Sequence, residues 1–193
     1  SDAVRKADFS NGMTYKGRFL AYAGDVVAYV IEPGPTPTPE SGLDQVPAAA
    51  FRLSSSNYPK QLRLAVDGNP RTRWMSGAPQ TGREWLASDL KGPRNIGRVD
   101  FVMSARSLRD YPRHVEVVAT DIGTDAGEHV LFSGPILAQI ARGIVRSPEL
   151  PVASIALPEN WSTRLVVRQL GQARRWNWSV DEMMLWERPA SGR

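Results

Sequence analysis

The chain has 193 residues, 41% hydrophobic and 23% charged, which are the proportions of a soluble globular protein. It contains no cysteine, which excludes thiol catalysis, disulfide frameworks and cysteine-ligated zinc. The net charge is +4, but acidic residues separate the arginines and no basic stripe indicates nucleic-acid binding. No apolar run reaches the length of about 20 residues that a transmembrane helix needs.

The N-terminal part predicts a β-hairpin. Residues 15–32, "YKGRFLAYAGDVVAYVIE", contain two apolar segments around a turn at Gly24 and Asp25. The stretch "PGPTPTPESG" follows, where prolines favour an extended spacer. We interpret the hairpin either as packed on the following domain or as the remnant of a preceding one, and expect the chain to be part of a longer protein. The expected division is a hairpin segment at 1–33, a linker at 34–44, a β-sandwich at 45–188 and a tail at 189–193.

The rest of the chain predicts short strands bounded by turn residues. In "HVEVV", Val115 and Val117 fall on one face of a strand, and Glu116 and Val118 on the other. Such a pattern is typical of an antiparallel sandwich or jelly roll. The predicted strands cover 98–104, 113–120, 128–134, 152–158, 163–170 and 180–187, and two short helical pieces are predicted at 41–49 and 136–144.

The stretch "LAVDGNPRTRWMSG", residues 64–77, brings several oxygen ligands into one turn. Asp67 supplies a carboxylate, Thr72 a hydroxyl, and Gly68 and Pro70 shape the backbone. Calcium prefers such a mixture of carboxylate, hydroxyl and carbonyl oxygens. In the alternative interpretation there is no metal, and Asp67 accepts backbone amides in an Asx-type turn. In both cases this loop is scaffold and performs no chemistry.

Five sequence blocks within about residues 48–187 resemble, in order, the discoidin family, also called the coagulation factor V/VIII type C domain. Its relatives include the family 32 carbohydrate-binding modules. The resemblance implies an all-β, eight-stranded antiparallel β-sandwich with jelly-roll, galactose-binding-domain-like topology, to which the hairpin is an extension. The blocks are a Ser-rich opening strand ("LSSSNYPKQL"), the loop motif at Ala65, Asp67, Gly68, Asn69, Thr72 and Trp74, "EWLASDL", "YPRHVEVVAT" and "STRLVVRQLGQARRWNWSVDEMMLWE".

The resemblance also implies a structural calcium ion and a ligand site. The calcium ligands would be the side chains of Asp67 and Glu182, the hydroxyl and carbonyl of Thr72, and the carbonyls of Asn69 and of Ala65 or Leu64. The ligand would bind loops at one end of the sandwich, which match residues 55–62, 75–84, 104–113 and 171–178.

The last of these loops holds the best candidates for sugar recognition. The apolar face of a sugar ring stacks on an indole, while planar polar groups meet its hydroxyls. Trp176 would be the stacking platform, with Arg174, Arg175 and Asn177 beside it. Alternatively, these arginines are solvated or paired with Asp110 or Glu84. Secondary candidates are Tyr58, Arg106 and Arg109.

The other aromatic residues and the two histidines are assigned differently. Trp74, Trp85 and Trp178 are expected in the core, and Trp186 in the core or at the lower rim. The galactose binders of the family often place a histidine on a ligand loop. Neither His114 nor His129 matches that position, so the sequence does not support galactose specificity.

The sequence favours a binding module over an enzyme. It contains no H-E-x-x-H, P-loop or G-x-G-x-x-G motif, and no nucleophile with a base at motif spacing. We expect a non-catalytic carbohydrate-binding module of a larger bacterial extracytoplasmic protein, periplasmic, secreted or at the cell surface. Its partners would be a glycan or polysaccharide and other domains of its own chain. One alternative is a ligand-free accessory domain of a membrane-bound glycosyltransferase or cell-envelope protein. Another is a module for protein or anionic lipid, with Met75, Leu108 and Trp176 as apolar contacts.

Overall fold

The computed structural model describes residues 19–21, 29–31, 42–122 and 125–189. The chain divides into two compact units, Ser1–Ser41 and Gly42–Arg193. In the first unit, β1 (Phe19–Ala21) and β2 (Tyr29–Ile31) pair antiparallel, with Leu20 opposite Val30. The predicted strand pairing is therefore confirmed, whereas the turn at Gly24 and Asp25 lies outside the described residues.

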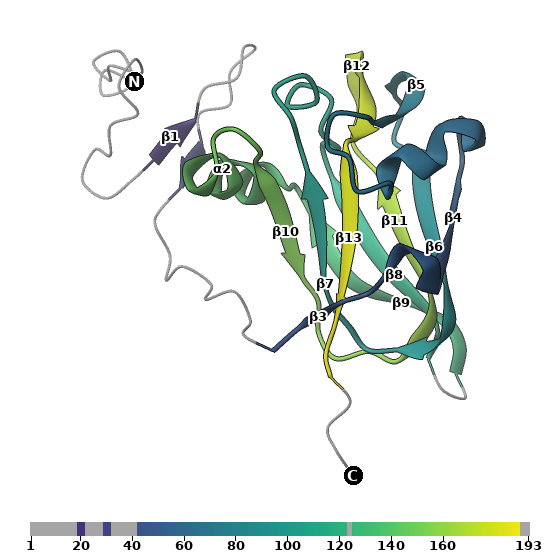
Figure 1. The fold of residues 1–193 in the computed structure, drawn as a ribbon. Helices are drawn as coiled ribbons and strands as arrows, with labels where there is room; N and C mark the ends of the chain where they lie inside the picture. Colours follow the sequence, from purple (N-terminus) through teal and green to yellow (C-terminus); the bar gives the residue numbers. More distant parts are fainter. Residues whose placement is uncertain (1–18, 22–28, 32–41, 123–124, 190–193) are drawn as a thin grey trace. The chain divides into compact units, whose positions relative to one another are not determined.

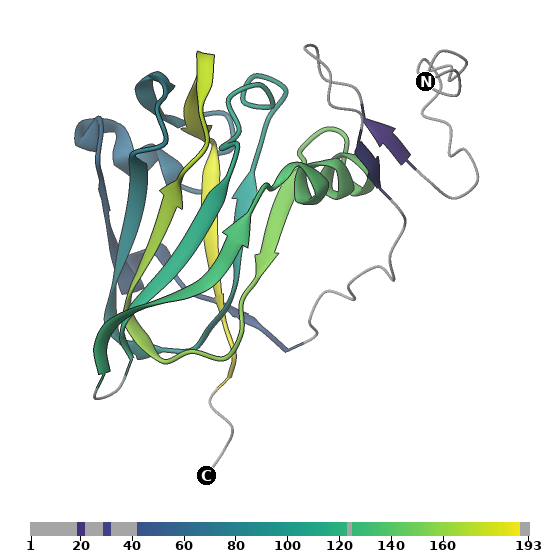
Figure 2. The same ribbon diagram turned by 180° about the vertical axis from the view of Figure 1, so that it is seen from behind.

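The second unit is a sandwich of two antiparallel sheets, as Figures 1 and 2 show from opposite sides. The all-β sandwich expected from the sequence is confirmed. In spatial order, the five-stranded sheet contains β4 (Phe51–Ser55), β6 (Glu84–Arg94), β11 (Ser162–Gln169), β8 (Val115–Ile122) and β9 (Asp125–Gly134). The four-stranded sheet contains β10 (Val152–Ala156), β7 (Ile96–Val102), β13 (Glu182–Glu187) and β3 (Asp44–Gln45).

The main core lies between the two sheets. Val115 and Val117 on β8 are buried in the same cluster as Phe101 on β7 and Leu185 on β13. Val118 faces the other way and joins a small cluster on the outer face of the five-stranded sheet. The predicted alternation along β8 is confirmed, because successive side chains of a strand point to opposite faces.

Two of the three tryptophans expected in the core occupy the centre of the sandwich. Trp74 and Trp178 are fully buried and meet edge to face, with ring centroids 5.4 Å apart. The core assignment is wrong for Trp85, which packs partly buried against the outer cluster because its neighbour Leu86 takes the inward position. Trp186 is also absent from the core: it lies on the face of β13 opposite Leu185, and the Arg98 guanidinium stands 4.5 Å from its ring centroid.

The two predicted helical pieces have different outcomes. Residues 136–144 are confirmed by α2 (Leu137–Arg146), which buries Ile140 in the core. The helix at 41–49 is wrong. The chain there forms β3, which pairs with β13, and then, after Pro47, a short 3-10 turn, η2 (Ala48–Ala50). Pairing with an existing sheet edge satisfies backbone groups that a single short helical turn leaves open.

The segments expected as two of the ligand loops contain a β-ribbon. Strands β5 (Trp74–Gln80) and β12 (Ala173–Val180) pair antiparallel at one end of the sandwich (Figure 1). Ala173 lies opposite Gln80 and Asn177 opposite Pro79, so the three residues 174–176 have no counterparts on β5. These three residues form a bulge in β12. The bulge interrupts the alternation of apolar and polar residues from which a strand is predicted. A 3-10 segment, η3 (Pro59–Ala65), covers part of the 55–62 loop.

Candidate functional site

Gln80 joins three of the four predicted ligand loops. Its side chain is buried, and Nε2 donates to the carbonyls of Tyr111 at 2.9 Å and Asn177 at 2.8 Å. Its Oε1 accepts from the amide of Arg113 at 3.3 Å. One amide group therefore ties β5 to residues 104–113 and to β12. The sequence analysis missed Gln80, because a single buried glutamine belongs to no periodic pattern.

Glu84 closes the turn between β5 and β6. Its Oε1 accepts from the amide and the hydroxyl of Thr81, both at 2.8 Å, and Oε2 accepts from the amides of Gly82 and Arg83 at 3.1 and 3.2 Å. Burial alone would raise the pKa of Glu84, but these hydrogen bonds outweigh it and hold the pKa below its usual value. Gln169 Nε2 also donates to Oε2 at 3.4 Å, and none of the described contacts of Glu84 is with an arginine side chain, so it does not neutralise the loop arginines.

We expect the Glu84→Gln variant to lose about 1.5–3 kcal/mol of stability at neutral pH, the range of hydrogen bonds to a charged group. The lowered pKa means that Glu84 stabilises the fold at pH values above its unfolded pKa. This contribution disappears as the pH falls through the folded pKa. Urea unfolding from pH 7 to pH 3 should therefore show a difference between wild type and variant that narrows in acid. The exposed Glu149, changed to Gln, is the control, and a pH-independent difference would contradict this account.

Trp176 and three neighbouring side chains form what we call the aromatic–arginine cluster: Arg109, Tyr111, Arg113 and Trp176. Trp176, in the β12 bulge, is 37% exposed, and the Arg109 guanidinium lies 5.5 Å from its ring centroid. Arg113 lies 3.9 Å from the ring centroid of Tyr111 and donates to the Arg109 carbonyl at 2.9 Å. The cluster thus combines two aromatic rings and two planar donors. Tyr111 and Arg113 were not among the predicted candidates.

The remaining sugar-site candidates divide between the bulge and other parts of the same end. Arg174 and Arg175 are exposed in the bulge beside Trp176, and Asn177 is half-buried, with its carbonyl held by Gln80. Tyr58 is 54% exposed, and its ring lies against Gly77 of β5, where an added Cβ would come within 2.0 Å of the ring. The described contacts join Trp176 to Arg109 but not to Tyr58.

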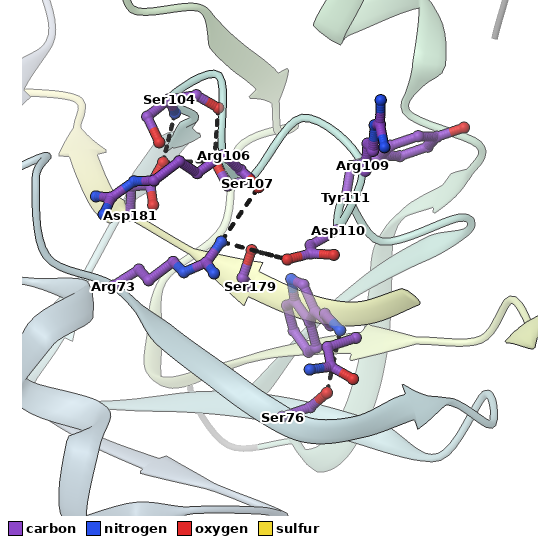
Figure 3. A network of polar contacts seen from close by, with 12 residues as sticks. Arg73, Ser76, Ser104, Arg106, Ser107, Arg109, Asp110, Tyr111, Ser179 and Asp181 are labelled. Carbon is purple, nitrogen blue, oxygen red and sulfur yellow. Dashed lines mark hydrogen bonds and ion pairs between the residues drawn. The ribbon is translucent and has the colours of Figure 1, made fainter. Parts of the chain in front are cut away.

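Arg106, in the 104–113 loop, belongs to a second network of polar contacts, which Figure 3 shows. Its guanidinium donates to the carbonyl of Arg71, and its own carbonyl accepts from Arg73 at 3.2 Å. Arg73 also reaches the carboxylate of Asp110 at 3.3 Å. Arg106 therefore connects residues 104–113 to the loop at 67–72, away from Trp176.

Two carboxylates, the partly buried Asp110 and the buried Asp181, hold the 104–110 segment in place. Desolvation raises the pKa of Asp110 and the nearby charge of Asp181 adds to this, while Arg73 and the Ser179 hydroxyl oppose it. Asp181, fully buried, accepts from the Ser104 amide and the Ser107 hydroxyl (Figure 3). The Asp110 carboxylate thus binds Arg73, just before β5, and Ser179, near the end of β12. The Asp181 carboxylate binds the start of the 104–113 loop. The ligand loops are therefore built on a rigid polar base.

The loop at 67–72 gathers the predicted calcium ligands. Thr72 Oγ1 lies 2.8 Å from both Asp67 Oδ2 and the Asn69 carbonyl, and the Gly68 amide donates to Glu182 Oε2 at 3.1 Å. Burial raises the pKa of Glu182 and the negative charge of Asp67 adds to this effect. Two carboxylates, a hydroxyl and a carbonyl converge here, and these are oxygen ligands of the kinds that a hard cation prefers.

The same loop also contains the Asx-type turn of the alternative interpretation. Asp67 Oδ1 accepts from the Asn69 amide at 2.9 Å. Within the described residues, no group of three or more His, Cys, Asp or Glu side chains could hold a metal. Any cation here would depend on two carboxylates together with neutral oxygens, including that of Ala65. Calcium at this loop stays a prediction.

Comparison with known proteins identifies this architecture. The F5/8 type C domain model matches residues 48–130. The sandwich is similar to the family 32 module of NanJ from Clostridium perfringens, solved in complex with galactose, with a TM-score of 0.59 and 14% identity over 75% of this chain and 99% of that one. A second Clostridium perfringens family 32 module, in complex with GalNAc-β-1,3-galactose, has a TM-score of 0.57 and 12% identity over 74% of this chain and 99% of that one. A third, from a family 31 glycoside hydrolase of that organism, has a TM-score of 0.56 and 11% identity over 75% of this chain and 95% of that one. No curated protein matches in sequence.

The fold and the loop arrangement define a β-sandwich module with its candidate ligand loops at one end. The resemblance stated from the sequence is confirmed: the F5/8 type C, or discoidin, model matches this chain over residues 48–130, and the sandwich has the fold of the family 32 carbohydrate-binding modules. No helix among the described residues is long and apolar enough to cross a membrane.

Proposed function

We propose that this domain is a non-catalytic glycan-binding module and that the aromatic–arginine cluster is its binding site. The observation that carries the proposal is the exposed Trp176 indole, presented by a bulge beside the Arg109 guanidinium. The apolar face of a sugar ring stacks on such an indole, and the N–H donors of Arg109, Arg174 and Arg175 face its hydroxyls. The galactose and GalNAc-β-1,3-galactose complexes of similar modules support this choice of ligand class.

The structure favours a glycan over an anionic membrane surface. Of the three residues that would have to insert into lipid, Leu108 packs against the core and Met75 is half-buried. Only Trp176 is exposed, and an interfacial anchor needs a larger apolar surface.

The domain would act by holding a larger bacterial extracytoplasmic protein at its substrate. Tethering to a glycan raises the local concentration of the attached domains without any chemistry in the module itself. The module from a family 31 glycoside hydrolase supports this arrangement. Calcium bound at Asp67, Asn69, Thr72 and Glu182 would stiffen the loop next to the site, and Ala65 is the further ligand proposed from the resemblance.

Trp176→Ala tests the site directly. On a glycan array, wild type should bind a defined set of sugars, and calorimetry with the best of them should show at least a tenfold loss for the variant, because stacking supplies more than about 1.4 kcal/mol. Val145, exposed on α2, changed to Ala is the control and should bind normally. Binding that survives Trp176→Ala would move the site elsewhere. No binding by the folded wild type would favour the ligand-free accessory domain.

A further inference from the structure

A second concave site lies at the other end of the sandwich. A pocket of about 370 Å³ is lined by residues that include Trp161, Lys91, Arg94 and Glu187. Arg94 and Glu187 are the last residues of β6 and β13, whose first residues lie at the end with the candidate sugar site (Figure 1). The volume falls within the range of roughly 300–1,000 Å³ found for small-molecule sites.

Trp161 is the one aromatic residue among the described residues that line this pocket. It is 45% exposed, more than Trp176, and among the described residues its side chain has no hydrogen-bond, ring or cation partner. Its two neighbours are buried and fixed. Asn160 donates to the carbonyls of Ile96 at 2.8 Å and Pro158 at 2.9 Å, and the Ser162 hydroxyl donates to Asn160 at 3.3 Å. The exposed indole of Trp161 therefore belongs to a segment that hydrogen bonds fix on both sides of it.

Hydrogen bonds and an ion pair within the protein fix several of the polar side chains that line the pocket. Arg94 Nη1 contacts both carboxylate oxygens of Glu187, at 2.8 and 2.7 Å. The Nε donor of Arg94 is buried and lacks a hydrogen-bond partner within the part of the chain that the structure describes. Arg188 is fixed by donation to the Leu157 carbonyl at 2.7 Å.

The charges around the pocket favour an anionic ligand. Of the charged residues that line the pocket, three are positive (Lys91, Arg94 and Arg188) and two are negative (Asp44 and Glu187), which is a formal excess of one positive charge. Lys91 is exposed, and the described residues include no ion-pair partner for it. An indole platform with an excess of positive charge fits a sugar that carries a carboxylate.

We propose that this pocket binds an acidic saccharide, such as a hexuronic acid residue. The C–H face of the sugar ring stacks on Trp161, and the exposed Lys91 ammonium faces its carboxylate. This site is separate from the aromatic–arginine cluster and does not depend on it. A module with recognition sites at both ends could cross-link two glycan chains, or two parts of one.

The experiment is calorimetry on the whole chain with methyl β-D-glucuronide and, as the neutral match, methyl β-D-glucoside. Wild type should bind the glucuronide more tightly than the glucoside. Trp161→Ala should lose at least tenfold in affinity for the glucuronide. Lys91→Met should weaken the glucuronide and leave the glucoside unchanged. Because both side chains are exposed, the variants should keep the wild-type Tm.

Trp176→Ala separates this proposal from the proposed function. It should bind the glucuronide like wild type, even though it loses the sugars that wild type selects on the glycan array. Three results would overturn the second site: no glucuronide binding by folded wild type up to about 10 mM, a range that still detects affinities near 1 mM, an unchanged affinity in Trp161→Ala, or a loss caused by Trp176→Ala.

Discussion

Replacing Gln80 by leucine should destabilise the domain and strongly weaken glycan binding. The variant keeps a side chain of similar size but cannot donate to the carbonyls of Tyr111 and Asn177, which are 2.9 and 2.8 Å from Nε2. Each carbonyl left unsatisfied in a buried position costs about 1–3 kcal/mol. Because the same bonds position Arg109 and Trp176 on their two segments, sugar affinity should fall at least about tenfold.

Urea unfolding and calorimetry measure the two effects separately. Gln61, an exposed glutamine in η3, changed to leucine is the matched control and should leave both stability and affinity near wild type. A Gln80→Leu protein that is less stable but binds sugar normally would show that Gln80 is structural only. It would then be necessary to seek the glycan site away from the three loops that Gln80 connects.

Replacing Glu182 by glutamine should abolish stabilisation by calcium. If calcium binds at residues 67–72, it stabilises wild type by about 2.7 kcal/mol at a concentration one hundred times its dissociation constant. Glu182 is one of only two carboxylates among the proposed ligands, so the variant should show no rise in Tm between chelator and millimolar calcium. In chelator it should be nearly as stable as wild type, because the neutral amide avoids both effects that raise the pKa of Glu182, first the burial of a charge and second the repulsion from Asp67.

Thermal unfolding with and without calcium is the measurement, and Glu159→Gln, at an exposed position, is the control. A wild-type Tm that ignores calcium would mean that hydrogen bonds alone hold the loop, as in the Asx-type turn. In that case the Gly68 to Glu182 bond would still tie the loop to β13. The result would not affect the sugar site, which the Trp176→Ala experiment tests.

Adjacent carboxylates at the β12–β13 turn connect the two loops. Asp181 holds the Ser104 amide and the Ser107 hydroxyl, and the next residue, Glu182, holds the Gly68 amide. Adjacent residues at the start of a strand point in opposite directions, so this dipeptide can bind a loop on each side. A conformational change in the 67–72 loop would therefore be transmitted to the 104–113 loop through the peptide bond between Asp181 and Glu182.

The sequence by itself determined the fold class and the identity of the motifs. Alternation of apolar residues along β8 placed Val115 and Val117 in the core, because a strand has a strict period of two. The order of motif blocks indicated the domain type that the F5/8 type C match confirms. The side chains around Asp67 also converge as their spacing predicted, because a turn of six residues brings them together whatever surrounds it.

Only the tertiary structure decided which residues share a site. The bulge at 174–176 appears only when β12 is paired with β5, so the sequence showed a loop there. Gln80 meets Asn177, 97 positions away, and Arg109 meets Trp176 across the two segments, contacts that no local pattern encodes. The pocket at Trp161 likewise needs the ends of β6 and β13 to be adjacent. Periodicity shows which face of a strand is buried, whereas the partners of a polar side chain depend on how distant strands pack.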